Sequence, residues 1–179
     1  KSKFSLLTLP SEDFPISEQC SAEYEIEIDQ KTFRSLIEKT DFCMANQDIR
    51  YYLNGMMMEF YQDKIRSVAT DGHRLALSEE KIKTGIKEST QIIIPRKAIH
   101  ELKRLLSQSE EDKCTLFITQ NNLKANFNNN IFTTKLVDGN FPDYDRAIPK
   151  EEKNILIGNR DTLTKAFLRT SILSTEKYK

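Results

Sequence analysis

The sequence has no tryptophan, and it holds only 5 glycines, 5 prolines and 2 histidines in 179 residues. So little glycine and proline excludes a collagen-like or low-complexity chain. The longest apolar stretches, such as 91–95, are far too short to cross a bilayer, so no membrane association is expected. Lys and Arg (27) balance Asp and Glu (27), so the net charge does not by itself indicate a nucleic-acid-binding protein.

The three cysteines, Cys20, Cys43 and Cys114, are odd in number, and none belongs to a CxxC pair. This pattern favours reduced thiols in a cytoplasmic protein over a disulfide framework or a zinc site. The sequence also lacks a Walker phosphate loop and a dinucleotide glycine motif. No metal and no cofactor are therefore predicted.

The length suits one domain or slightly more. The chain begins at Lys1 without Met or a hydrophobic signal core, and we expect it to be a piece of a longer protein. A repeat supports this expectation, because Phe14-Pro15 and Phe141-Pro142 each follow a short strand-like run and lie 127 residues apart. The repeat predicts one complete module with parts of two neighbours.

Each module also divides into two similar halves. Strand-like runs end at Ile28, Ile94 and Ile157, and each precedes a stretch with the apolar spacing of a helix. Asp29 and Asn159 are predicted to cap their helices. The predicted helices are 29–46, 95–107 and 159–173, and the predicted strands between them are 51–60, 64–70, 74–78, 115–119, 123–128 and 131–137. The pattern predicts an α+β fold of β-α-β-β-β half-units, with helices on one face of antiparallel sheets.

Basic side chains recur on the predicted helices, whereas acidic residues concentrate in loops and tails. The helix cations are Lys31, Arg34, Lys39, Arg96, Lys97, Lys103 and Arg104. A surface lined by such helices would suit salt-dependent contact with phosphates that carries no sequence information. The alternative is an ordinary solvated helix face.

A second candidate nucleic-acid contact follows the first helix, with Gln47, Arg50, Tyr51 and Tyr52 close together. In a strand the two tyrosines point to opposite faces, so one is expected in the core and the other could meet a sugar-phosphate or a base. Packing alone is the alternative role.

Five motifs resemble one known family. They are RYYLNG at 50–55, VATDGHRLA at 68–76, IPRK at 94–97, KLVDG at 135–139 and FPDY at 141–144. Together they strongly resemble the bacterial DNA polymerase III beta subunit, the DNA sliding clamp. The resemblance implies a non-catalytic processivity factor with the DNA-clamp fold, whose subunits have three similar domains. Two subunits close head to tail, as a homodimer ring, around double-stranded DNA. It further implies that 1–19 ends the first domain, 20–145 is the complete middle domain and 146–179 begins the third.

The resemblance also implies two sets of site residues. The DNA-binding set comprises Gln47, Arg50, Tyr51, Tyr52, Arg96 and Lys97, to which we add the helix cations Lys31, Arg34 and Lys103. The partner-peptide cleft comprises Leu53, Thr70, Gly72, His73, Arg74, Leu75, Pro142, Arg146 and Ala147. The implied partners are the DNA polymerase III catalytic subunit, the clamp loader and other proteins with a clamp-binding motif. Ala147 departs from the larger aliphatic residue usual in the family, which predicts a shallower wall.

Two other functions stay open at the level of sequence. One is a peptide-docking module that does not encircle DNA. The other is a hydrolase built on Asp71 and His73, since residues two apart can hydrogen-bond and perturb a pKa. Against the hydrolase, Asp71-Gly72 is more simply a hairpin turn. The Met56–Met58 run is expected to be strand core.

Overall fold

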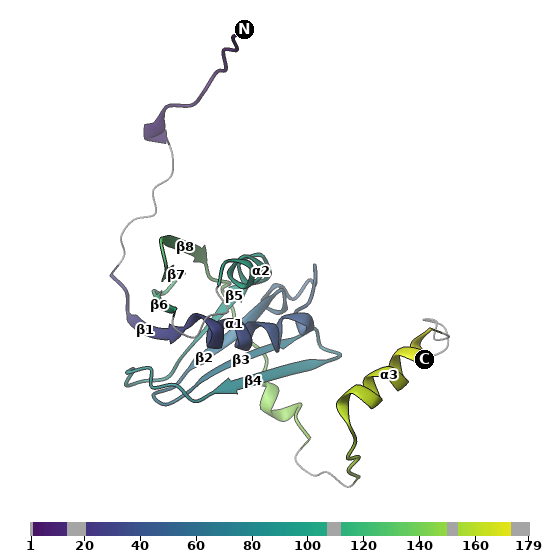
Figure 1. Ribbon diagram of the computed structural model, residues 1–179. Helices are drawn as coiled ribbons and strands as arrows, with labels where there is room; N and C mark the ends of the chain where they lie inside the picture. Colours follow the sequence, from purple (N-terminus) through teal and green to yellow (C-terminus); the bar gives the residue numbers. More distant parts are fainter. Residues whose placement is uncertain (1, 14–20, 107–111, 150–153, 173–179) are drawn as a thin grey trace. The chain divides into compact units, whose positions relative to one another are not determined.

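A computed structural model describes residues 2–13, 21–106, 112–149 and 154–172 (Figure 1). The chain divides into two compact units, Lys1–Phe141 and Pro142–Lys179. Each unit is considered by itself. Phe14, Pro15 and Cys20, which the sequence analysis singled out, lie outside the described residues.

The first unit contains the two predicted β-α-β-β-β half-units in order, which confirms the repeat within the module. The first half-unit consists of β1 (Tyr24–Asp29), α1 (Gln30–Glu38), β2 (Gly55–Phe60), β3 (Ile65–Thr70) and β4 (Leu75–Glu80). The second consists of β5 (Thr90–Pro95), α2 (Arg96–Leu105), β6 (Lys113–Ile118), β7 (Asn122–Phe127) and β8 (Asn130–Lys135). The 3-10 helix η1 (Ser11–Asp13) precedes β1, and two more, η2 (Asp41–Cys43) and η3 (Tyr51–Leu53), lie in the connection between α1 and β2.

The two half-units exchange their first strands. One sheet has the order β1-β6-β7-β8 and the other has the order β4-β3-β2-β5, and every pairing is antiparallel. Ile26 of β1 thus lies opposite Leu116 of β6, and Met57 of β2 lies opposite Ile93 of β5. Because neither half-unit completes a sheet alone, the module folds as one interlocked body.

The helices α1 and α2 pack against each other on one side of the sheets, as the sequence predicts (Figure 1). Their apolar faces supply Phe33, Leu36, Ile37, Ala98, Ile99 and Leu102, all buried. Met56 and Met58 belong to the same core, and Met57 is buried as well, so the methionine run is strand core as expected. Burial of each large aliphatic or aromatic side chain stabilises the fold by about 1.5–3 kcal/mol.

The first helix ends earlier than its periodicity predicts, at Glu38 rather than near residue 46. Thr40 Oγ1 donates to Leu36 O at 2.9 Å, and Ser67 Oγ of β3 donates to the same carbonyl at 2.9 Å. These buried hydroxyls satisfy a carbonyl at the helix end, and the chain then turns into η2. The predicted strand 51–60 also begins later, at Gly55, because Tyr51–Leu53 form η3.

The predicted helix caps have opposite outcomes. Asn159 Oδ1 accepts from the backbone N–H groups of Asp161 at 3.0 Å and Thr162 at 3.1 Å, which confirms its capping role. Asp29 does occupy the N-cap position of α1, but its side chain makes no capping hydrogen bond, so the predicted side-chain cap is wrong. The register places Asp29 opposite Lys113, and the lysine Nζ lies 2.5 Å from the Asp29 carboxylate. Because the Asp29 carboxylate pairs with Lys113 across the strands, it does not accept from the backbone N–H groups at the start of α1.

The second unit contains the 3-10 helix η4 (Tyr144–Arg146) and the helix α3 (Arg160–Ser171). Across both units, no described helix is long and apolar enough to cross a membrane. The described cysteines, Cys43 and Cys114, are buried free thiols. Burial raises the pKa of both thiols, that of Cys114 to about 12.

Candidate functional site

The loop between α1 and β2 is closed on itself by Asn54. Asn54 Oδ1 accepts from the Asp48 N–H at 2.9 Å, and Asn54 Nδ2 donates to Asp48 O at 2.8 Å. The Ala45 N–H also donates to Leu53 O at 3.0 Å. At the turn of this loop, Gln47 has a φ of +58°, a conformation uncommon for a residue with a side chain. Gln47 and Ile49 are exposed at this end of the module, so the loop presents them on a fixed backbone.

Asp48 binds Arg50 on the exposed surface of this loop. The Asp48 carboxylate accepts from the Arg50 backbone N–H at 2.8 Å, from Nε at 3.0 Å and from Nη2 at 2.8 Å. This fork is the geometry in which guanidinium and carboxylate bind most strongly. Its hydrogen bonds lower the pKa of Asp48 to about 2 and raise the pKa of Arg50.

The TDGHR segment forms a tight turn between β3 and β4 around Asp71. Asp71 Oδ1 accepts from the backbone N–H groups of His73 at 2.9 Å and Arg74 at 3.0 Å, and Arg74 Nε lies 2.9 Å from Oδ2. These hydrogen bonds lower the pKa of Asp71 to about 2. Gly72 has a φ of +88°, which glycine adopts without strain. The hairpin-turn interpretation of Asp71-Gly72 is thus confirmed.

Arg50 connects the loop to this turn. Its Nη2 donates to Asp71 O at 3.3 Å, and its guanidinium lies against Gly72. From α2, Arg96 Nη1 donates to Met44 O at 2.8 Å and to Ala45 O at 3.3 Å. The α1–β2 loop, the β3–β4 turn and the start of α2 surround an open hollow of about 500 Å³. It is lined by Phe42, Met44, Ala45, Asn46, Gln47, Asp48, Asp71, His73, Arg74 and Arg96. The structure therefore brings predicted DNA-contacting residues and predicted cleft residues to one surface.

The tyrosines do not point to opposite faces of a strand, so that expectation is wrong. They lie in η3, where Tyr51 is exposed and Tyr52 is half-buried. Their rings contact edge to face, with centroids 5.8 Å apart and an interplanar angle of 68°. A Cβ built on Gly139 would stand 3.4 Å from Tyr51 Oη, so Tyr51 also packs over the backbone there.

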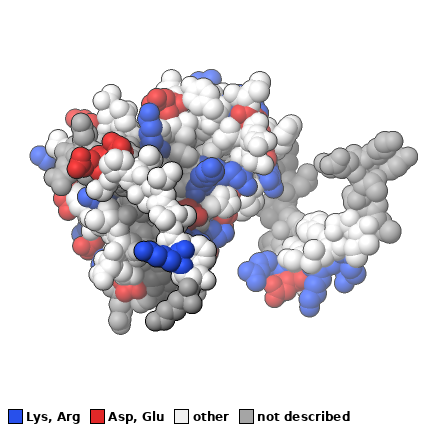
Figure 2. Space-filling model, turned by 90° about the horizontal axis from the view of Figure 1, so that it is seen from above, with Lys and Arg blue, Asp and Glu red and all other residues white. Residues whose placement is uncertain are grey.

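The helix cations lie on two packed helices, and several are engaged in structural contacts. Arg34 Nη1 donates to Leu106 O at 2.9 Å, and Lys103 Nζ lies 2.8 Å from Asp41 Oδ2. Arg34 thus links α1 to the end of α2, and Lys103 links α2 to η2, which follows α1. Lys31 and Lys97 are exposed. Acidic residues are interspersed with Lys and Arg on the face seen in Figure 2, so the separation of charge is less complete than the sequence suggests.

The comparison with known families decides the assignment. The family model of the DNA polymerase III beta subunit, central domain, matches residues 27–143. The chain belongs to this family. The beta sliding clamp of Proteus mirabilis is 48% identical over 179 residues, which are 100% of this chain and 48% of the relative. The beta sliding clamp of Escherichia coli (strain K12) is 45% identical over the same span, again 48% of its length.

Solved clamp structures share the fold. The DNA polymerase III subunit beta from Pseudomonas aeruginosa matches with a TM-score of 0.90 at 44% identity, covering 99% of this chain and 48% of that chain. A sliding clamp from the same organism, solved bound to griselimycin, matches with a TM-score of 0.90 at 45% identity and the same coverage. The chain thus spans about half the length of its sliding-clamp relatives.

The predicted partner-peptide cleft is divided between the two units. Leu53 is buried, Thr70 and Leu75 are largely covered, and Gly72, His73 and Arg74 are exposed around the turn of the first unit. Pro142, Arg146 and Ala147 are exposed in the second unit, where Arg146 Nε lies 2.7 Å from the Asp143 carboxylate. The cleft as a joint site of these residues remains a prediction.

The sequence analysis assigned no role to Asp48 and Asn54, which hold the loop. It did identify Asp71, which holds the predicted turn by accepting backbone N–H groups. Asp48 and Arg50 stand two apart, a spacing that allows a carboxylate to accept from the backbone two residues on and also to bind the guanidinium. This spacing is the sequence signal from which the Asp48–Arg50 contact could have been predicted. The Asp71 carboxylate bonds the His73 main chain, and no hydrogen bond joins it to the ring of His73, a described residue.

Proposed function

We propose that this chain is the central part of a sliding clamp, a processivity factor that encircles double-stranded DNA and tethers the replicative polymerase. In this assignment 1–19 ends the first clamp domain, 20–145 is the middle domain and 146–179 begins the third. The proposal includes a head-to-tail homodimer ring for the full-length protein and no catalytic role. Since bacteria replicate DNA in the cytoplasm, that is where we propose that the protein acts.

One observation carries the proposal. In a chain of the clamp family, both half-units place their helix on the same side of the sheets, where α1 and α2 pack together and Arg34 of α1 bonds the end of α2. A paired-helix surface with exposed Lys31 and Lys97 supports weak phosphate contact, because such contacts carry no sequence information and are lost as salt displaces them. A clamp that slides requires contact of this kind.

The loop 46–54 supports a second contact with DNA. Because Asp48 neutralises Arg50, exposed Gln47 and Tyr51 are the side chains left to meet a sugar-phosphate by hydrogen bonding and stacking. We propose that Arg50 and Arg96 position this loop, whereas Lys31, Lys97 and Gln47 contact DNA directly.

For the partner site, we propose that the turn around Asp71 contributes to a peptide cleft, to which the resemblance also assigns Pro142, Arg146 and Ala147. Buried Leu53 and half-buried Leu75 supply apolar surface, and exposed His73 and Arg74 supply polar orientation. Polymerase, clamp loader and other proteins with a clamp-binding motif are the proposed ligands. The relative solved with griselimycin supports ligand binding in this family.

An NMR titration of the 179-residue chain with a short DNA duplex at low salt tests the DNA surface. We expect amide shifts at Lys31, Lys97 and Gln47 that disappear as salt rises. As a control, Lys83→Ala removes an exposed lysine away from the helices, and the same titration of this variant should give the same amide shifts as the unchanged chain. Shifts confined to other surfaces, or none, would favour the peptide-docking module that does not encircle DNA.

A further inference from the structure

The outer edge of β1 is open. The Gln30 N–H donates to Asp112 O at 2.9 Å, and the register continues this pairing to Ile28. Because hydrogen bonds alternate along an antiparallel strand, the main-chain groups of Glu25 and Glu27 point away from β6. Within the described part of the chain, no hydrogen bond reaches these outward groups. β1 therefore presents a free strand edge.

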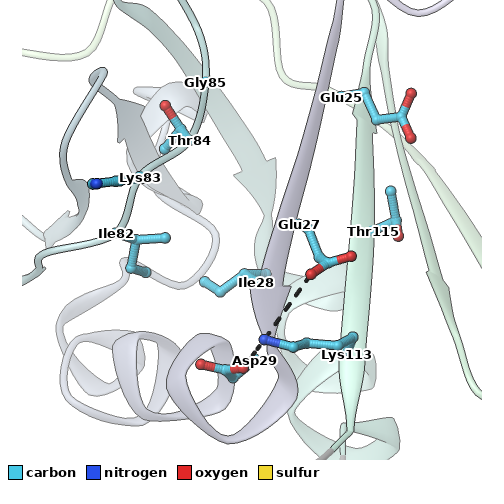
Figure 3. A pocket seen from close by; sticks show the side chains of 10 residues that line it. All are labelled: Glu25, Glu27, Ile28, Asp29, Ile82, Lys83, Thr84, Gly85, Lys113 and Thr115. Carbon is cyan, nitrogen blue, oxygen red and sulfur yellow. Dashed lines mark hydrogen bonds and ion pairs between the residues drawn. The ribbon is translucent and has the colours of Figure 1, made fainter.

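A fixed segment faces this edge across a hollow. Residues 82–85 connect β4 to β5, and the Ile82 N–H donates to Asp63 O at 2.9 Å while the Thr84 N–H donates to Gln62 O at 3.1 Å. Thr84 Oγ1 also donates to Tyr61 O at 2.6 Å. The segment is thus anchored on its far side, and a hollow of about 670 Å³ separates it from β1 (Figure 3).

The corresponding place in the second half-unit is closed. There the Val137 N–H, just after β8, donates to Ile93 O of β5 at 2.9 Å. The first strands of the two half-units therefore differ: β5 is bonded on the side where β1 is open. The counterpart of this bond in the first half-unit would run from Ile82 to Glu27, but the Ile82 N–H donates to Asp63 O instead, so the outer edge of β1 stays unpaired among the described residues.

Charge indicates what kind of segment fits. Glu25, Glu27 and Asp29 alternate with the buried residues of β1, so their side chains leave the same face of the sheet. Lys113 Nζ lies 2.5 Å from Asp29 Oδ1 but 4.0 Å from Glu27 Oε1, and the Glu27 side chain is 66% exposed. Neither Glu25 nor Lys83 on the opposite bank forms an ion pair with a described residue. Glu25 therefore has no ion-pair partner among the described residues and Glu27 is only weakly paired with Lys113, whereas Lys83 adds one positive charge across the hollow.

We propose that this open seam binds an extended peptide with basic side chains at alternate positions, added as a strand beside β1. Its main chain bonds the outward groups of Glu25 and Glu27, and its basic side chains lie along their carboxylates. Affinity comes from strand addition, and the preference for basic sequences comes from the acidic row. This interaction goes beyond the proposed function and does not depend on DNA or on the partner-peptide cleft.

An acetylated and amidated hexapeptide of alternating lysine and threonine tests the proposal. Titrated into the 179-residue chain, it should shift the amide signals of Glu25, Glu27 and Gly85 saturably and slow hydrogen exchange at the two glutamates. The same peptide with every backbone nitrogen methylated keeps its charge but can donate no backbone hydrogen bond from either edge, so it cannot pair as a strand. Equal shifts with both peptides, or no saturable shift with either, would overturn the proposal.

Charge reversal supplies the second arm. Glu25→Lys with Glu27→Lys should weaken the unmethylated peptide about tenfold through like-charge repulsion. Glu38→Lys with Glu101→Lys makes the same change in net charge on exposed positions of α1 and α2, and it should leave the affinity unchanged. Equal weakening by the two double variants would show that the peptide binds through the net charge of the chain alone, which would contradict the proposal. The comparison of the two peptides uses only the wild-type chain, so it can overturn the proposal even if a charge-reversal variant fails to fold.

Discussion

The Arg50 guanidinium lies so close to Gly72 that a Cβ on this glycine would stand 3.1 Å from both Nη1 and Nη2. Arg50 belongs to the loop assigned to DNA, and Gly72 belongs to the turn assigned to the peptide cleft. The proposed DNA-contacting loop and the proposed peptide cleft therefore both depend on the contact between Arg50 and Gly72.

Replacing Gly72 tests that contact. Gly72→Ala should destabilise the fold by about 1 kcal/mol or more, because alanine is strained at a positive φ, and it should also displace Arg50. Gly85→Ala is the matched control, since Gly85 has a φ of +76° with nothing within 4 Å. Urea unfolding should show a loss in both variants, whereas the NMR signal of the Arg50 Nε–H should move only in Gly72→Ala. An unmoved Arg50 would contradict the contact.

Acid should weaken the loop and the turn within a defined pH window. The pKa values of Asp48 and Asp71 are lowered to about 2 in the fold, against about 3.9 in an unfolded chain. The unfolded state then binds more protons, so their stabilisation is complete above pH of about 4 and is lost as the pH falls towards about 2. Urea midpoints measured across this window should fall less steeply in Asp48→Asn and Asp71→Asn. If the urea midpoints of the two variants fell with pH as steeply as those of the wild type, the lowered pKa values of Asp48 and Asp71 would not explain the acid sensitivity.

The neighbouring cations Arg96 and Lys97 should have different roles. Arg96→Met should cost about 1–3 kcal/mol of unfolding free energy, because it leaves the Met44 and Ala45 carbonyls without their charged donor. Lys97→Met should leave stability unchanged but reduce the salt dependence of duplex binding by about one phosphate contact. Thermal unfolding and fluorescence anisotropy at several salt concentrations measure the two effects. If Lys97→Met lost the stability and Arg96→Met did not, the division of roles would be wrong.

Strand exchange makes Gly55 sensitive to any side chain. A Cβ there would stand 2.6 Å from Ile94 O of β5, so Gly55→Ala should force β2 and β5 apart and cost about 1–3 kcal/mol. Since the exchanged strands join both half-units, β1 and β6 amides should lose exchange protection together with those of β2. Hydrogen exchange that weakens only the β2 sheet would show that the half-units fold independently.

The sequence predicts the element order because periodicity and turn residues are local signals. The β-α-β-β-β repeat, the burial of Met56–Met58 and the Asn159 cap all depend on residues within a few positions of each other. The exchange of β1 and β5 could not be predicted in this way, because the repeat is the same whichever sheet the first strand joins. It is decided by pairings such as Ile26 with Leu116, far apart in the chain.

The errors have the same physical origin. The early end of α1 depends on Ser67, which lies 31 residues beyond Leu36 and meets it only in the fold. The failed Asp29 cap depends on Lys113, a cross-strand neighbour 84 residues away. At the candidate site, the sequence indicates Arg50 and Arg96 as cations but not that carboxylate and carbonyl oxygens already hold them.

The central claim is that this chain forms part of a ring around DNA, and topology tests it most directly. The 179 residues would replace the matching segment of the Escherichia coli beta sliding clamp, with dimer formation by the chimera checked first by gel filtration. Loaded on a nicked circular plasmid, the chimera should be retained at high salt and be released when the circle is cut once. A dimeric chimera that dissociates from the intact circle as fast as from linear DNA would contradict the account.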